Sequence, residues 1–215
     1  MGLDEFQSES DTTSTSPDLE QAKTSSRSFE DEKVDVPDAI AGNLLADAMI
    51  KTYDDHSASF IQITEDWDYL FYLKQQCPDI FLKSKIRVLE GNKYYLRSSE
   101  NYDMYPIYKK WYKRGYKSLP RAYNINSDIL KHWYMCSGEV ADDEIHLYAN
   151  WMNDLDSGIM STILRSKIAS ARIERQRNDK TGETRFRFFH NADKGLFEYI
   201  GSCPIACYQS KWLTV

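Results

Sequence analysis

Arginine alternates with phenylalanine in the short run Thr184–Phe189, where Arg185 and Arg187 each precede a phenylalanine, Phe186 and Phe188. Residues two apart point to the same face of a strand, so this spacing predicts one apolar and one cationic face. The preceding run Arg172–Arg177 can pair with it as a β-hairpin. The basic side chains of this predicted hairpin are Arg175, Arg177, Lys180, Arg185 and Arg187. They could contact nucleic-acid phosphates, or they could form cross-strand pairs with Glu174 and Glu183 on a solvated hairpin.

A helix predicted directly before this hairpin carries hydroxyls and one arginine on a single face. In Gly158–Ala171, one side is apolar and consists of Ile159, Met160, Ile163, Leu164, Ile168 and Ala171. The opposite side holds Ser161, Thr162, Arg165 and Ala169, with Ser166 at the border. No acidic residue occurs between positions 157 and 173. A face without carboxylates can approach DNA closely.

Two more helices are predicted upstream of these elements. Ser127 is a suitable N-cap for the first, whose apolar face is Ile129, Leu130, Trp133 and Cys136, and Gly138 can end it. Asp142 can cap the second, whose inner face is Ile145, Tyr148, Ala149 and Met152. A turn at residues 153–156 then leads to Ser157, a suitable cap for the third helix.

This order of three helices and a basic hairpin resembles the winged helix-turn-helix DNA-binding superfamily over residues 127–189. The resemblance implies that the third helix enters the major groove, where Ser161, Thr162 and Arg165 read base edges and Ser166 meets a phosphate. It also implies that the hairpin acts as a wing on the flanking backbone. A winged helix that serves as a protein-contact module is the alternative.

The remaining residues divide by composition and charge. Residues 1–82 carry 5 Lys/Arg and 18 Asp/Glu, whereas residues 83–123 carry 11 and 3. Residues 1–38 are predicted to be a disordered acidic Ser/Thr-rich tail, which resembles leaders of proteins from halophilic archaea and their viruses. Residues 39–126 are predicted to be a helical region with a hairpin at Gly91-Asn92, and residues 190–215 a C-terminal appendage.

The segment from Tyr94 to Tyr123 is rich in tyrosine and lysine. It contains eight tyrosines and Trp111, interleaved with cations such as Lys109, Lys110 and Lys113. Such a mixture can line a nucleic-acid groove, where cations meet phosphates and rings stack on bases. The preferred interpretation is an amphipathic helix whose rings pack inward while its cations face water.

Catalytic motifs are absent from the sequence. It contains no phosphate-binding glycine loop, no nucleophile elbow and no metalloprotease motif. Asp54-Asp55-His56 and Asp66-x-Asp68 could hold a divalent ion for a nuclease, but such carboxylates are also common in polar loops. Cys203 and Cys207 lack the further ligands that zinc requires. We therefore expect no catalytic residue, no metal site, no cofactor and no small-molecule ligand.

Together these features predict a mostly helical α+β protein of 215 residues with a C-terminal winged helix and a β-hairpin wing. The predicted function is sequence-specific binding of double-stranded DNA as a transcriptional regulator, and not as an enzyme. Homodimerisation would supply a second recognition helix. The alternative is a non-catalytic structural or assembly protein that uses its aromatic surplus in protein interfaces. Because no signal peptide or membrane span is evident, we expect a cytoplasmic location.

Overall fold

The computed structural model describes residues 35–100, 104–141, 144–189 and 192–212. The tail was predicted for residues 1–38, and residues 1–34 of it lie outside the described residues. None of the helices in the described residues is long and apolar enough to cross a membrane.

The described chain contains the same arrangement of elements twice. The first half consists of α1 (Asp38–Leu45), β1 (Met49–Thr52), β2 (Ala58–Thr64), α2 (Trp67–Gln76), α3 (Pro78–Phe81), β3 (Arg87–Val88), β4 (Tyr94–Arg97) and α4 (Met104–Trp111). The second consists of α5 (Ser127–Ser137), β7 (Gly138–Ala141), β8 (Glu144–Tyr148), α6 (Asp154–Lys167), β9 (Ile173–Arg177), β10 (Thr184–Phe188) and α7 (Ala192–Ile200).

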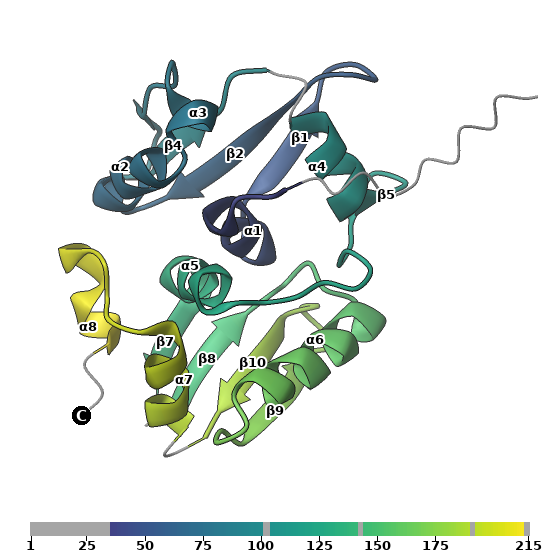
Figure 1. Cartoon of the computed structure of the whole chain (residues 1–215), viewed down its shortest axis with the longest axis vertical. Helices are drawn as coiled ribbons and strands as arrows, with labels where there is room; N and C mark the ends of the chain where they lie inside the picture. The colour runs from purple at the N-terminus through teal and green to yellow at the C-terminus, as the bar shows by residue number, and fades with distance from the viewer. Residues whose placement is uncertain (1–34, 101–103, 142–143, 190–191, 213–215) are drawn as a thin grey trace, which may run out of the picture. The chain divides into compact units, whose positions relative to one another are not determined.

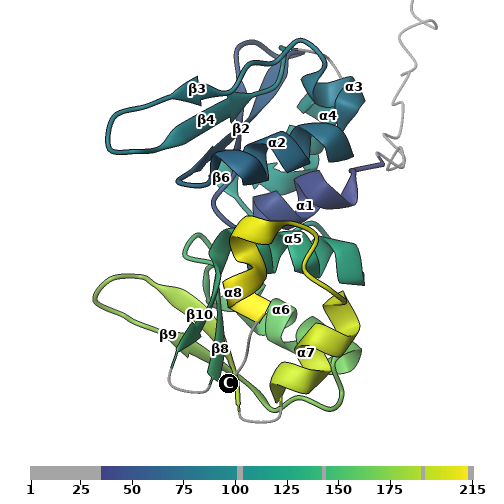
Figure 2. The same cartoon turned by 90° about the vertical axis from the view of Figure 1, so that its left-hand side faces the viewer.

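Each half forms a four-stranded antiparallel sheet, and the strand orders correspond. The first sheet has the order β1-β2-β4-β3 and the second has the order β7-β8-β10-β9. A small hairpin, β5 (Tyr112–Lys113) and β6 (Tyr116–Lys117), connects the halves. The short elements η1 (Ala206–Tyr208) and α8 (Gln209–Trp212) follow α7. In Figure 2 the two sheets lie toward one side of the described fold and most helices lie toward the other.

Helices α1 and α5 pack against each other between the two sheets (Figure 1). Every residue of α1 from Ala39 to Leu45 is buried, and α5 buries Ile129, Leu130 and the run from His132 to Met135. A helix that is buried on nearly all sides lies at the centre of a fold. The core therefore continues through this helix pair from one sheet to the other.

The structure contradicts the predicted C-terminal winged helix. The predicted second helix, beginning at Asp142, is replaced by strand β8, which pairs with β7 and β10. Ile145 and Leu147 are buried, and they alternate with His146 and Tyr148, whose partners are the outward-facing Arg187 and Arg185. The helical spacing of Ile145, Tyr148 and Ala149 competed with this two-residue period, and pairing with a distant strand favoured the strand. The hairpin that was predicted as a wing is half of this sheet.

Candidate active site and nucleic-acid interface

The C-terminal end of α1 carries an exposed carboxylate. The helix ends at Leu45, and Asp47 lies two residues later, directly before β1. Asp47 is exposed, whereas Ala46 and Ala48 on either side of it are buried. The buried alanines fix the backbone of this connection, so that the carboxylate is presented to solvent from a well-packed position.

Lys117, which lies in the β5–β6 hairpin, is hydrogen-bonded to the backbone at the end of α1. Its Nζ donates to the carbonyl oxygens of Ala46 at 3.1 Å and Ala48 at 2.8 Å, and lies 4.9 Å from the ring centre of Trp151. Burial lowers the pKa of Lys117 to about 7, although the nearby Asp47 carboxylate favours the charged form. Trp151 also donates to the Leu45 carbonyl at 2.8 Å. Two side chains thus position the backbone on both sides of Asp47.

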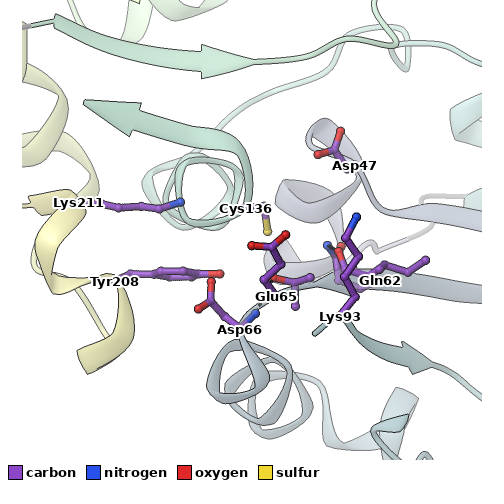
Figure 3. Close-up of a pocket in the computed structure, with 10 residues that line it drawn as sticks. Asp47, Gln62, Glu65, Asp66, Lys93, Cys136, Tyr208 and Lys211 are labelled. Atoms are coloured by element: carbon purple, nitrogen blue, oxygen red, sulfur yellow. Dashed lines mark hydrogen bonds between the residues drawn. The ribbon is translucent and has the colours of Figure 1, made fainter. Parts of the chain in front are cut away.

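Asp47 lines a pocket of about 310 Å³ together with a buried amide. Gln62 of β2 is only 2 % exposed, and its Oε1 has no hydrogen-bond partner among the described residues. A buried acceptor without a partner is uncommon and often marks a place where a water, ion or ligand binds. The other charged side chains that line the pocket are Glu65, Asp66, Lys93 and Lys211, as Figure 3 shows.

The corresponding end of α5 has different chemistry. Ser137 is the last residue of this helix, and its hydroxyl donates to the Tyr148 carbonyl at 2.9 Å. Lys211 of α8 donates from Nζ to the Met135 carbonyl at 2.9 Å, and its own carbonyl accepts from the Tyr134 hydroxyl at 2.7 Å. In Figure 3, Lys211 extends from the C-terminal segment toward α5. The α5 end therefore carries a hydroxyl where the α1 end carries a carboxylate, and each end has a lysine bonded to its backbone.

A buried polar network joins α1, α2 and α5 behind these ends. The Tyr69 hydroxyl donates to Asn43 Oδ1 at 2.9 Å and lies 3.3 Å from His132 Nδ1. The Cys136 thiol lies 3.1 Å from Asn43 Oδ1 and 3.0 Å from the Tyr69 hydroxyl. Burial raises the pKa of Cys136 to about 12 and lowers the pKa of His132 to about 4. Both groups are neutral at physiological pH, so this network serves to fix the helix pair.

The outer face of the first sheet, which points away from the core, is cationic. Strands β1 to β4 contain no acidic residue, and the alternation with buried Phe60 and Leu96 places Lys51, Arg87 and Arg97 on this face. The Arg97 guanidinium lies 4.7 Å from the ring centre of Tyr53. Polyanions would meet cations and exposed aromatic rings on this surface.

The outer face of the second sheet alternates acids and bases. Glu139, His146, Arg187 and Glu174 form one row across the four strands. Arg187 binds Glu144 in a bidentate manner, with two nitrogen–oxygen distances of 2.7 Å. The Arg185 Nε donates to Gln176 Oε1 at 3.1 Å. Arg185 and Arg187, two of the predicted DNA-binding residues, thus lie on this outer face.

The structure places Arg175 and Arg177 on the opposite, helix-facing side of the sheet. Arg175 donates to the Asp154 carbonyl at 2.9 Å and to the Ser157 hydroxyl at 2.8 Å. Arg177 donates to the Met152 carbonyl at 2.8 Å. Both arginines therefore join the sheet to the start of α6. Lys180 lies exposed in the connection between β9 and β10.

The four predicted residues of α6 do not share one exposed face. Ser161 is 5 % exposed, whereas Thr162, Arg165 and Ser166 are exposed. The Arg165 guanidinium donates to the Ile173 carbonyl at 2.9 and 3.1 Å. Thr162 and Ser166 donate to carbonyls of α6 itself. The structure thus ties this side of α6 to its own backbone and to β9.

Comparisons with known proteins identify the fold. A profile of the LAGLIDADG DNA endonuclease family matches residues 38–193. The homing endonuclease I-WcaI, solved with its DNA recognition sequence, superposes with a TM-score of 0.69 at 13% identity over 82% of this chain and 85% of that one. I-DmoI, solved with DNA and Mn, superposes with a TM-score of 0.52 at 15% identity, over 78% and 99%. A search of curated protein sequences finds no significant match.

Sequence reasoning missed Asp47, Gln62 and Lys117. The family name spells nine amino acids, and Ile40–Ala48 agrees with it at Ala41, Gly42, Ala46 and Asp47. The corresponding residues 130–138 agree only at Leu130 and Gly138, because the second copy has diverged. The small residues of α1 were therefore the available signal, but residues 39–126 were interpreted only as a helical region with a hairpin.

These findings correct the predicted identity. The winged helix-turn-helix resemblance, the role as a transcriptional regulator, the alternative of a non-catalytic assembly protein and the expectation of a non-enzyme are contradicted by the family match over most of the described chain. I-WcaI and I-DmoI are both homing endonucleases and both were solved with DNA, which agrees with this match. The chain belongs to the LAGLIDADG DNA endonuclease family.

Proposed function

We propose that the protein binds double-stranded DNA across the outer faces of its two sheets and hydrolyses a phosphodiester beside Asp47. The supporting observations are the family match and the DNA in the neighbouring structures. Two sheets in one chain can each engage one half-site of a duplex. From the sequence, a homodimer was expected to be needed for this. The observation that carries the catalytic part is that the exposed Asp47 carboxylate lines one pocket with Gln62, whose buried oxygen has no hydrogen-bond partner among the described residues.

The residues at the α1 end fit a divalent cation. The Asp47 carboxylate and Gln62 Oε1 are the hard oxygen donors that Mg²⁺ and Mn²⁺ prefer. No group of three or more His, Cys, Asp or Glu in the described residues could hold a metal by itself. Mg²⁺ commonly completes its coordination with water and substrate phosphates, so one protein carboxylate suffices. Such a cation would polarise the phosphate and lower the pKa of a bound water.

The protein side chains have separate roles in this proposal. Asp47 and Gln62 would hold the cation at the α1 end, where it would supply an activated water. Lys117 is a positioning residue, because its hydrogen bonds fix the backbone on both sides of Asp47 and its charge lies beside that carboxylate.

DNA contacts are proposed for the outer faces of both sheets. Lys51, Arg87 and Arg97 of the first sheet would meet phosphates or guanine edges. On the second sheet, Arg185 and Arg187 would do the same, while Glu174 could accept from cytosine amino groups. Lys180 in the β9–β10 connection would contact the flanking backbone. The hydroxyls and arginines on the α6 side would support the sheet from behind.

Cleavage of DNA by an Asp47→Asn variant tests this function. A target duplex is first selected by binding from a random pool and is then incubated with Mg²⁺. We expect the wild-type protein to cut it and Asp47→Asn to lose at least 100-fold in rate while still binding the duplex, since a neutral amide holds the cation poorly. Asp79→Asn, an exposed aspartate of α3, is the matched control and should cut normally. Undiminished cutting by Asp47→Asn would refute the assignment.

A further inference from the structure

The C-terminal ends of α1 and α5 occupy equivalent positions in the two halves, but they carry side chains of different charge. Asp47 follows α1 and leads into β1, and Ser137 ends α5 and leads into β7. Both helices thus enter the first strand of their own sheet. The equivalent of the Asp47 carboxylate in the second half is a serine hydroxyl. Since duplex DNA presents two strands to a protein built from two similar halves, each end would face one strand.

The hydrogen bonds of Ser137 make it a poor substitute for a carboxylate. Its hydroxyl lies 2.9 Å from the Tyr148 carbonyl and 3.3 Å from the Trp133 carbonyl, so its proton is directed to the backbone. A neutral hydroxyl also contributes no negative charge to a cation site. The donor set at the α5 end therefore does not fit a divalent cation in the way that the α1 end does.

Lys211 places a positive charge near this end of α5, in the pocket that Asp47 also lines. Its ammonium is bonded to the Met135 carbonyl, near the C-terminal end of α5, where the helix dipole favours a cation. The segment that carries it is anchored by Tyr134, whose ring packs edge-on against Trp212 at 5.0 Å and whose hydroxyl donates to the Lys211 carbonyl. Ser137 supplies no carboxylate to offset this ammonium, whereas Asp47 offsets Lys117 at the α1 end, so a divalent cation is disfavoured near Ser137.

The nearest acid of this half is directed elsewhere. Glu139 lies two residues after Ser137, on the outer face of the second sheet. Its carboxylate accepts from the Tyr148 hydroxyl and lies 3.5 Å from His146 Nδ1. Glu139 thus belongs to the cross-strand row of the second sheet.

We propose that the protein cuts only the DNA strand that lies over Asp47, and that Lys211 binds the phosphate of the other strand, which is not cleaved. This inference rests on the proposed endonuclease function. In the one cleavage event, a water oxygen bonds to phosphorus and the bond from phosphorus to one ester oxygen breaks. One proton of the water is lost to solvent, and the departing oxygen takes up a proton to become a hydroxyl. Lys211 has two further ammonium protons for the uncut phosphate.

Strand-resolved cleavage of the selected duplex tests the inference with the wild-type chain. The two strands carry different fluorophores, and a supercoiled plasmid containing the site is digested in parallel. We expect one labelled strand to be cut and the plasmid to become an open circle without a linear product. Cutting of both strands at similar rates would overturn the inference but leave the endonuclease function intact. Cutting of neither strand would overturn both.

Counting bound ions provides a readout that does not depend on cleavage. Titration of the wild-type protein–DNA complex with Ca²⁺ in a calorimeter should give one site per chain, and Asp47→Asn should give none. Two sites in the wild-type complex would contradict the inference.

A double variant tests the cause of the asymmetry. Ser137→Asp with Lys211→Met supplies the carboxylate and removes the competing ammonium, so we expect a second ion and cutting of the second strand. Ser137→Asn with Lys211→Met has the same shape without the charge and should still cut one strand. Thermal melting establishes that both variants are folded. A folded Ser137→Asp/Lys211→Met protein with one ion and one cut would refute this explanation.

Discussion

Gly42 of α1 lies against the backbone of α5 at Ile129, so closely that a Cβ on Gly42 would lie 2.4 Å from the Ile129 carbonyl oxygen. It would also lie 2.5 Å from the Cβ of His132. Only glycine permits this approach, because the obstructing atom belongs to a helix backbone that cannot rotate away. The spacing of the two central helices, and with it the separation of their two ends, therefore depends on Gly42.

Gly42→Ala should destabilise the protein by about 3 kcal/mol, since overpacking of this kind forces the backbones apart. The free energy of unfolding in urea measures the effect. Gly158→Ala is the matched control, because this glycine is also helical and a Cβ there meets nothing within 4 Å. That substitution should leave stability unchanged or raise it by about 0.5–1 kcal/mol. Equal effects of the two substitutions would show that the close approach is not required.

His132 predicts a loss of stability in mild acid. Its pKa is lowered by burial to about 4 in the folded chain, from an ordinary value of 6.5. The unfolded chain therefore binds more protons between these values, and the free energy of unfolding falls as the pH decreases from 6.5 to 4. The contribution of this one group is about 3 kcal/mol.

Urea unfolding between pH 4 and 7 checks this prediction. His132→Phe keeps a ring in the stack with Tyr72 but cannot take up a proton, so its stability should change less over this range. His56→Phe, at an exposed position, should retain the wild-type dependence on pH. The prediction fails if His132→Phe and the wild-type protein lose stability in parallel.

Lys117 predicts a change in stability at the alkaline end of the pH range. Burial lowers its pKa to about 7 from an ordinary 10.5, so the unfolded chain binds more protons between these values. The free energy of unfolding should therefore rise with pH above 7, by up to about 1.4 kcal/mol per pH unit. Lys117→Met should lack this rise between pH 7 and 9, whereas Lys113→Met, an exposed lysine of the same hairpin, should show it. A wild-type stability that is constant over this range would contradict the lowered pKa of Lys117.

Local features of the fold could be predicted from the sequence. The Gly91-Asn92 turn joins β3 to β4 with φ values of 73° and 58°, the left-handed conformation that these residue types tolerate. The strands around Phe186 and Phe188 follow from alternation alone, and both rings are buried. The predicted helix starts were wrong in detail. Asn126 and Asn153 cap α5 and α6, whereas Ser127 and Ser157 were expected.

The candidate site could not be predicted in the same way. Asp47 lies between α1 and β1, Gln62 on β2 and Lys117 on β6, and only the packing of these elements brings them together. Strand β8 pairs with β10 across an intervening helix and strand, so its identity depends on a partner about 40 residues away. A short apolar run with mixed spacing carries no information about such a partner, which is why a winged helix was predicted instead.

The two sides of the second sheet should respond differently to the loss of an arginine. Arg185 lies on the outer face, and Arg175 lies on the helix-facing side, bonded to Asp154 and Ser157. If the outer face contacts DNA phosphates, Arg185→Met should weaken binding and reduce the dependence of log K on log salt by about 0.9. Arg175→Met should lower stability instead, because two of its hydrogen bonds to the start of α6 are lost.

Salt titrations of DNA binding, with fluorescence anisotropy as the readout, distinguish the two arginines. Each variant is measured between low and physiological salt on the same selected duplex, and its unfolding midpoint is recorded alongside. Methionine keeps much of the arginine stem, so that changes report the charge and not the packing. A reduced salt slope for Arg175→Met with an unchanged slope for Arg185→Met would place the DNA on the α6 side. That outcome would remove the outer faces from the proposed interface and would require a different route for the strand to reach Asp47.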